Sequence, residues 1–73
     1  IHPAFVWIPL DITNPHGIAA LAGIITMTPG TLSAELSPDS RHLLVHCFHL
    51  DDADATVAQI KQRYESPLRE IFP

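Results

Sequence analysis

Three segments of the chain carry the apolar patterns of β-strands. Residues 31–36 alternate between apolar and polar positions, with the period of two that a half-buried strand requires, and residues 43–50 follow as a further strand. Residues 4–10 are apolar, β-branched and aromatic, and Pro9 suggests a sheet edge because proline cannot donate to a ladder. Turn-forming residues at 37–40 predict that the second and third strands form a hairpin.

A first helix is predicted between the first two strands. Asn14 or Thr13 can cap it, Pro15 suits its first turn, and apolar residues recur at helical spacing as far as Thr28. The segment is apolar on most of its surface. We therefore expect it to be buried on more than one side.

A second helix follows an acidic cap at residues 51–54, where carboxylates complement the helix dipole. Its apolar stripe consists of Val57, Ile60 and Tyr64. We expect the polar residues of this segment to form a solvated face: Lys61, Gln62, Arg63 and Glu65. Pro67 either ends this helix or kinks it, and the sequence leaves both outcomes open.

The predicted order of elements is strand, helix, strand, strand, helix, which is an α+β fold of the β-α-β-β-α type. A right-handed crossover makes the first two strands parallel, and the third, antiparallel to both, fits between them. We expect a three-stranded mixed sheet in the order 1-3-2, with two helices on one face, as in half of a ferredoxin-like fold. The 73 residues are enough for one domain.

Strand alternation divides the side chains between two faces of this sheet. The face under the helices is predicted to hold Val6, Ile8, Leu10, Leu32, Ala34, Leu36, Leu43, Val45 and Cys47. The open face is predicted to hold Phe5, Trp7, Leu44, His46 and Phe48, beside Thr31, Ser33 and Glu35. An exposed apolar patch on a small domain typically marks an interface. The opposite assignment stays open, and it would also leave an apolar face uncovered.

The charge composition narrows the choice of partners. Charged residues make up 16% of the chain, below the usual share of about 25%, so we expect a partner to cover part of the surface. Four basic against eight acidic residues argue against nucleic acid, because phosphate binding requires clustered Lys and Arg. A helix over 15–28 would be about 20 Å long, short of the roughly 30 Å of bilayer hydrocarbon. We expect this piece to be soluble.

No group of residues in the sequence suggests a catalytic or metal centre. His46 and His49 point to opposite faces of a strand, and His42 lies roughly 13 Å from His46 along it. Cys47 and His46 are adjacent in a strand and therefore point to opposite faces, so the imidazole cannot readily accept the thiol proton. The aspartates in 51–54 lack the Gly and Glu of a calcium loop. We predict a protein that is not an enzyme and that uses no metal or cofactor.

Three segments resemble those of a known family. They are 24–31 (Ile-Ile-Thr-Met-Thr-Pro-Gly-Thr), 43–50 (Leu-Leu-Val-His-Cys-Phe-His-Leu) and 60–68 (Ile-Lys-Gln-Arg-Tyr-Glu-Ser-Pro-Leu). In this order they resemble the E subunit of the multi-subunit Na+/H+ antiporters of bacteria, the Mrp or Mnh type. Met27 stands where leucine is usual in that family. The resemblance covers nearly the whole chain.

The resemblance implies an accessory or assembly part of a complex that exchanges Na+ or another monovalent cation for protons, with no catalytic residue to carry over. Since the chain starts at Ile1 without Met, we expect it to be the C-terminal soluble domain of a longer membrane subunit. It would lie at the cytoplasmic face of the bacterial inner (plasma) membrane. Its partners would be other antiporter subunits, and the membrane through an N-terminal segment not included in these 73 residues.

The family motif at the end of the first helix has two interpretations. Its residues are Thr26, Thr28, Pro29, Gly30 and Thr31. They either only terminate the helix or also contact the membrane or a neighbouring subunit. A different function also stays open: a free-standing regulatory domain that forms a homo-oligomer, or binds a small ligand, through Phe5, Trp7 and Phe48.

Overall fold

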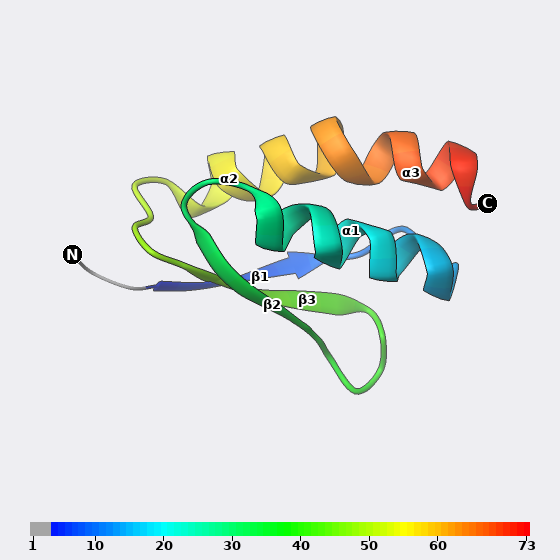
Figure 1. Cartoon of the computed structure of the whole chain (residues 1–73), viewed down its shortest axis with the longest axis horizontal. Helices are drawn as coiled ribbons and strands as arrows, with labels where there is room; N and C mark the ends of the chain where they lie inside the picture. Colours follow the sequence, from blue (N-terminus) through cyan, green and yellow to red (C-terminus); the bar gives the residue numbers. More distant parts are fainter. Residues whose placement is uncertain (1–3) are drawn as a thin grey trace.

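Three strands and a layer of helices make up the computed structural model, which describes residues 4–73 (Figure 1). The strands are β1 (Ala4–Pro9), β2 (Thr31–Leu36) and β3 (His42–Cys47). The helices are α1 (Pro15–Met27), α2 (Ala53–Ile60), the π-helical turn η1 (Lys61–Glu65) and α3 (Ser66–Ile71). Because α2, η1 and α3 follow one another without a break, they form the single second helix that the sequence predicts.

The strand order is β1-β3-β2, as predicted. The central strand β3 pairs antiparallel with both neighbours, and its Val45 lies opposite Val6 of β1 and Ala34 of β2. The two outer strands therefore run in the same direction without pairing, so both ladders of the described sheet are antiparallel. The α+β class and the 1-3-2 order are confirmed.

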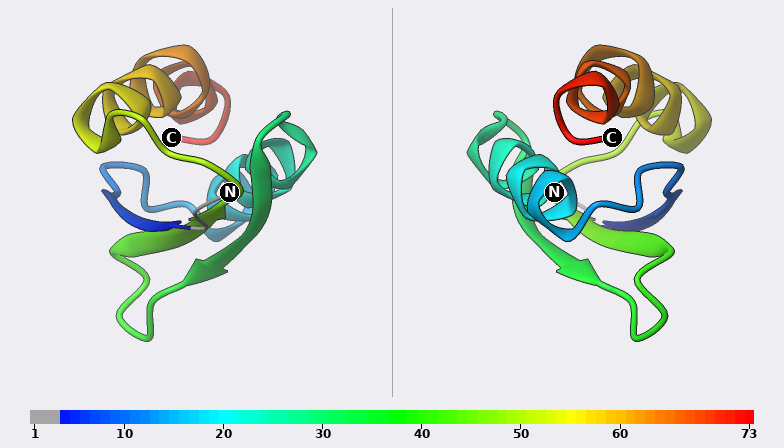
Figure 2. Two further views of the ribbon diagram at one scale, coloured as in Figure 1. Left: turned by 90° about the vertical axis from the view of Figure 1, so that its left-hand side faces the viewer. Right: turned by 90° about the vertical axis from the view of Figure 1, so that its right-hand side faces the viewer.

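Both helices cover the same face of the sheet (Figure 2). Helix α1 packs against β2, and α2 lies against β1. Helix α1 also contacts the second helix through η1 and α3. The hairpin turn between β2 and β3 extends away from the helices. One face of the sheet is therefore covered, and none of the helices within residues 4–73 lies on the other face.

The caps predicted for both helices are present. The Asn14 side chain accepts hydrogen bonds from the backbone N–H groups of His16 (2.9 Å) and Gly17 (3.4 Å). Asp52 caps α2 by accepting from the N–H of Ala55 (3.1 Å). Each cap satisfies N–H groups that have no partner within their helix.

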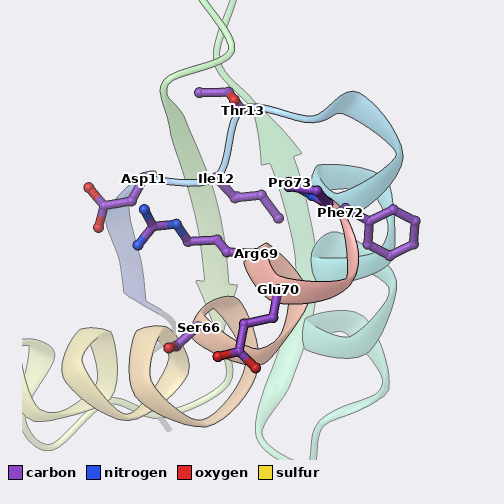
Figure 3. Close-up of a pocket in the computed structure, with 8 residues that line it drawn as sticks. All are labelled: Asp11, Ile12, Thr13, Ser66, Arg69, Glu70, Phe72 and Pro73. Carbon is purple, nitrogen blue, oxygen red and sulfur yellow. The ribbon is translucent and has the colours of Figure 1, made fainter.

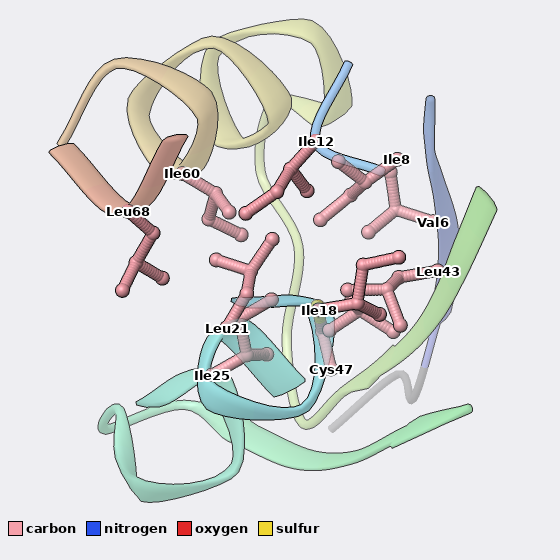
Figure 4. Close-up of a cluster of buried hydrophobic side chains, with 11 residues drawn as sticks. Val6, Ile8, Ile12, Ile18, Leu21, Ile25, Leu43, Cys47, Ile60 and Leu68 are labelled. Atoms are coloured by element: carbon pink, nitrogen blue, oxygen red, sulfur yellow. The ribbon is translucent and has the colours of Figure 1, made fainter. Parts of the chain in front are cut away.

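The core fills the space between the helices and the covered face of the sheet (Figure 4). It consists of Val6, Ile8, Ile12, Ile18, Leu21, Ile25, Leu43, Val45, Cys47, Ile60 and Leu68. Burying one large aliphatic side chain of this kind stabilises a fold by about 1.5–3 kcal/mol. The inward set predicted for β1 and β3 is thus confirmed, and it settles which face is buried.

The inward set predicted for β2 is partly wrong. Leu32 is 50% exposed and Leu36 is 45% exposed. A β-bulge explains Leu32, because Thr31 pairs with Cys47 and Ser33 with His46, which leaves Leu32 without a partner on β3. Leu36 lies at the end of an edge strand, where a hollow of about 410 Å³ separates it from α1.

The second helix passes through Pro67 instead of ending there. At η1 the backbone widens, and the N–H of Ser66 donates to the carbonyl of Lys61, five residues earlier. A proline ring clashes with the carbonyl four residues before it in a regular α-helix. The wider turn immediately before Pro67 relieves that clash, and the helix continues to Ile71.

The predicted third strand is too long at its end. β3 stops at Cys47, and Phe48 instead donates its backbone N–H to the carbonyl of Gly30 (2.8 Å).

Within residues 4–73, no helix combines the length and the hydropathy that crossing a membrane requires.

Candidate functional site

The uncovered side of the sheet, which we call the open sheet face, carries four of the five residues predicted for it: Phe5, Trp7, Leu44 and His46. Phe48, the fifth, follows the end of β3. Phe5 is 62% exposed, Trp7 55% and Phe48 45%. Leu44 and His46 are half-buried between the strands beside them. The largest side chains on this face therefore point to the outside of the domain, opposite the core.

Aromatic rings and imidazoles pair across the strands of this face. Phe5 and His46 are register partners on β1 and β3, and their rings stack with centroids 4.3 Å apart at 17°. Trp7 meets His42 edge-on at 6.1 Å and 89°. Offset-stacked and edge-to-face geometries are the favourable ones for such rings. The pairs hold the aromatic side chains in defined positions in the absence of a partner.

A hollow of about 550 Å³ lies beside Trp7, where the hairpin turn borders the open sheet face. Asp39 and His42 contribute to its wall. Asp39 accepts hydrogen bonds from the Ser37 hydroxyl (2.6 Å) and the Arg41 backbone N–H (3.0 Å), and these bonds lower the pKa of its carboxyl group. A charged carboxylate therefore stands at the rim of an aromatic surface.

The motif turn, residues 26–31, uses its hydroxyl groups on the end of α1. Thr26 donates to the carbonyl of Gly23 (2.8 Å) and Thr28 to that of Ile24 (2.8 Å). Thr31 donates to the carbonyls of Thr28 (2.8 Å) and Ile25. These carbonyls include groups that a helix end leaves without a backbone partner, so the hydroxyls have a structural role.

Gly30 turns the chain from α1 into β2. Its φ of 93° lies in the left-handed region that favours glycine. Behind this turn lies a hollow of about 200 Å³, which is also lined by Cys47, His49 and Tyr64. Burial raises the pKa of the Cys47 thiol, so Cys47 behaves as a small apolar group and not as a nucleophile.

A buried carboxylate, which the sequence patterns did not reveal, joins η1 to the end of β1. Glu65 is only 2% exposed. Its Oε2 accepts the backbone N–H groups of Asp11 (2.7 Å) and Ile12 (3.0 Å), and its Oε1 accepts Lys61 Nζ (2.8 Å). Lys61 also contacts Asp11 Oδ2 (3.0 Å) and donates to the carbonyl of Pro9. We call this group the η1–β1 seam.

The prediction that Lys61 and Glu65 belong to a solvated helix face is therefore wrong. The widened turn η1 changes the direction in which the following side chains point, and it turns Glu65 towards the β1–α1 loop. Partial burial disfavours the charge on Lys61, but hydrogen bonds to Glu65 and Asp11 outweigh this effect and raise its pKa. The hydrogen bond from Lys61 in turn lowers the pKa of Asp11. Gln62 and Arg63 are exposed, as predicted.

A pocket of about 440 Å³ lies between the β1–α1 loop and α3 (Figure 3). Arg69 extends across it towards Asp11, and Glu70 stands at its other side. The Ile12 and Phe72 side chains form part of its lining. The charged groups of the pocket are of both signs and come from its rim, and they do not converge on one point as a binding site for a single ion would require.

The described residues offer little for catalysis. Within residues 4–73, no three His, Cys, Asp or Glu side chains are close enough to share a metal ion. His46 lies on the open sheet face and Cys47 in the core, so they cannot act together as base and nucleophile.

Comparison with known proteins identifies the family. A sequence model of the family described as "Na+/H+ ion antiporter subunit" matches residues 1–71. The chain belongs to this family. The match extends over almost the whole sequence, including all three segments that carry the resemblance to the antiporter E subunit.

Curated E subunits of cation/proton antiporters are similar to the chain along nearly its full length. The Na(+)/H(+) antiporter E subunit of Bacillus subtilis is 30% identical over 71 residues, which is 97% of this chain and 45% of that protein. The probable K(+)/H(+) antiporter E subunit of Rhizobium meliloti is 32% identical over 72 residues, which is 99% of this chain and 44% of that protein. The chain therefore spans less than half the length of these relatives.

The three segments that resemble the antiporter E subunit meet in the folded domain. The hollow behind the motif turn is lined by Thr31 from the first segment, His49 and Leu50 from the second, and Ile60 and Tyr64 from the third. Segments far apart in the sequence thus build one junction between α1, β3 and the second helix.

Proposed function

We propose that this chain is a non-catalytic accessory and assembly domain of a multi-subunit antiporter that exchanges a monovalent cation, with Na+ as the leading candidate, for protons. Membership of the antiporter subunit family supports this proposal. Two relatives that are named for Na+/H+ and K+/H+ exchange support the class of ion but not the choice between the two.

The observation that carries the proposal is the open sheet face. A domain of this size exposes two of its largest side chains, Phe5 and Trp7, by more than half. Exposed apolar surface of this kind marks interaction sites on soluble domains. The function that this geometry supports best is therefore contact with a partner and not chemistry.

The motif turn is the second surface that we propose for contact. Its threonine hydroxyls are engaged by α1, while Pro29 and Gly30 at the tip are exposed. We propose that this tip meets a neighbouring subunit, and that the whole domain belongs to a longer membrane subunit at the cytoplasmic face of the plasma membrane.

Co-purification of the antiporter subunits tests the proposal. The full-length protein carrying both Phe5→Ser and Trp7→Ser is expected to recover less of the other subunits than the unchanged protein. Ile71→Ser provides a control, because Ile71 is 67% exposed but lies at the end of α3, away from both the open sheet face and the motif turn. Equal recovery from the double variant and the control would refute the assignment of the open sheet face.

A further inference from the structure

We propose that the free edge of β1 pairs with an extended segment of a neighbouring antiporter subunit, which adds a fourth strand to the sheet. This inference rests on the proposed function, because it states how the neighbouring subunit is held beside the open sheet face. The strand order leaves β1 at one edge of the sheet, on the side of the second helix (Figure 2). An edge strand presents unpaired backbone N–H and C=O groups, and these groups recognise another strand.

The backbone groups of Phe5 and Trp7 point away from β3. In an antiparallel pair, residues that exchange hydrogen bonds with the partner strand alternate with residues whose backbone groups point outward. Leu10 is of the first kind, because its N–H donates to the carbonyl of Arg41 (2.8 Å). Alternation from Leu10 therefore places outward groups on every second residue of β1, which are Phe5, Trp7 and Pro9.

Two contacts agree with this direction. Lys61 reaches β1 from the second helix and donates to the carbonyl of Pro9, so that carbonyl points away from β3. Phe5 and His46 stack with their ring centroids 4.3 Å apart. Such closeness is expected for pairs that exchange no hydrogen bonds, because their side chains lie nearer to each other. The outward groups of Phe5 and Trp7 meet no other strand within residues 4–73.

The opposite edge of the sheet, β2, is better protected against pairing. Its bulge leaves Leu32 without a partner on β3, and bulges make an edge irregular. Glu35 adds a charge to β2, and α1 packs against it. β1 pairs with β3 without a shift of register and has no charged residue, and its protecting feature is Pro9 at its last position. β1 is therefore the better template for an added strand.

The side chains beside the edge define the segment that fits it. Phe5 and Trp7 are exposed on the open sheet face, whereas Val6 and Ile8 face the core. An added strand alternates between the same two faces, so the residues that it places beside Phe5 and Trp7 are expected to be apolar. None of the six residues of β1 is charged. The structure therefore favours an extended, uncharged segment about as long as β1.

The size of the edge favours a segment of another subunit over a second copy of this chain. A strand of six residues is about 20 Å long and one strand spacing is about 4.8 Å, so edge pairing covers about 200 Å² over both faces. Stable protein interfaces bury roughly 800 Å² per partner. A segment of a subunit held in the same complex needs much less area, because the complex keeps it at a high effective concentration.

Hydrogen exchange tests this pairing residue by residue. The full-length protein is compared alone and in the assembled antiporter. The amides of Val6 and Ile8 bond to β3 and are expected to exchange slowly in both samples, which shows that the sheet is intact. The amides of Phe5 and Trp7 are expected to become at least about tenfold slower on assembly, the effect of one hydrogen bond each. Unchanged exchange of Phe5 and Trp7 would overturn the inference.

A proline substitution separates the backbone of Trp7 from its side chain. Trp7→Pro and Trp7→Ala both remove the ring, but only Trp7→Pro also removes the outward N–H, and neither removes a bond to β3. In the full-length protein, we expect Trp7→Pro to recover about tenfold less of the other subunits than Trp7→Ala. Equal recovery by the two folded variants, checked by circular dichroism, would overturn the inference.

The same pair of substitutions on β2 provides the matched control. The N–H of Ser37 donates to the carbonyl of His42 (2.9 Å), so alternation makes the N–H of the preceding residue, Leu36, point away from β3. Leu36→Pro is expected to recover as much of the other subunits as Leu36→Ala does. A loss as large as that of Trp7→Pro would overturn the choice of the β1 edge.

Two further results distinguish this inference from the proposed function. If the variant with Phe5→Ser and Trp7→Ser loses the subunits while Trp7→Pro and Trp7→Ala recover equal amounts, the open sheet face binds through side chains alone. If the amides of Phe5 and Trp7 become slow when the protein alone is concentrated, a second copy supplies the strand. Both results overturn the inference and leave the proposed function standing, whereas normal recovery by the double serine variant would refute the contact through this face.

Discussion

The η1–β1 seam and the open sheet face depart from the usual distribution of polar and apolar residues in opposite ways. In the seam, a carboxylate is buried among backbone N–H groups and a lysine. On the open sheet face, Phe5 and Trp7 are exposed to solvent. A buried charge is tolerated only when it is fully paired, so the seam serves the fold. An exposed aromatic ring adds little to stability, so the open sheet face is free to serve contact.

Removing the carboxylate of the seam is expected to have the largest effect on stability. Glu65→Ala leaves two backbone N–H groups and Lys61 without their partner, and we expect a loss of about 3–5 kcal/mol in the free energy of unfolding. Urea denaturation measures it. Glu70→Ala, at an exposed position of the same helix, should stay within about 0.5 kcal/mol. Equal losses would show that the seam is not special.

The two glycines of α1 have different surroundings, because Gly17 is closely packed and Gly23 is not. A Cβ at Gly17 would lie 2.6 Å from Ile12 Cδ1 and 3.0 Å from Phe72 Cβ, whereas a Cβ at Gly23 meets nothing within 4 Å. We expect Gly17→Ala to destabilise by about 1–3 kcal/mol and Gly23→Ala to stabilise by up to about 1 kcal/mol. Thermal unfolding of both variants checks the signs. The same sign for both would contradict the packing of Gly17 against the second helix.

The dependence of stability on pH tests the charged groups of the seam without a substitution. The pKa of Lys61 is raised above 10.5, so its contribution is complete below that value and is lost as the pH rises through the folded pKa. The pKa of Asp11 is lowered below 3.8, so its contribution is present above that value and is lost as the pH falls through the folded pKa. Stability should therefore fall at both ends.

The variant Lys61→Met sharpens this prediction. It removes the cation of the seam and should flatten the alkaline decline in the melting temperature above about pH 10. The acid decline should also become shallower, because the hydrogen bond that lowers the pKa of Asp11 is gone. Unchanged slopes in the variant would show that Lys61 does not control either decline.

The smallest effect on stability is expected on the open sheet face. Phe5→Ser and Trp7→Ser remove side chains that are more than half exposed, and each should change the free energy of unfolding by less than about 1 kcal/mol. Chemical denaturation followed by circular dichroism measures both. A loss as large as that of Glu65→Ala would mean that the face is part of the fold, and the contrast between the two regions would disappear.

The elements that follow from local patterns were predictable from the sequence. Strand alternation divided the residues of β1 and β3 correctly into two sets, of which one lines the core, although the sequence left open which set is buried. Asn14 and Asp52 cap their helices as expected. These features depend on neighbouring residues, which the sequence displays directly. Phe5, Trp7, Leu44 and His46 also share one face as predicted, although the role of this face as an interface stays a prediction.

The remaining features depend on small departures from regular geometry. One bulge in β2 exposes Leu32, and one widened turn before Pro67 buries Glu65. Each changes the direction of side chains that a regular period places on the other side. Pro67 was the only signal of such a change in the second helix, and it does not indicate which residue becomes buried.

If this domain contributes contact and not chemistry, loss of the open sheet face should change how many complexes form and not how fast each one works. Cation/proton exchange is measured in membranes that contain the antiporter with the full-length protein carrying Phe5→Ser and Trp7→Ser, and is divided by the amount of assembled complex. We expect fewer complexes, each exchanging at the normal rate. A normal amount of complex with slower exchange would contradict a role in contact alone.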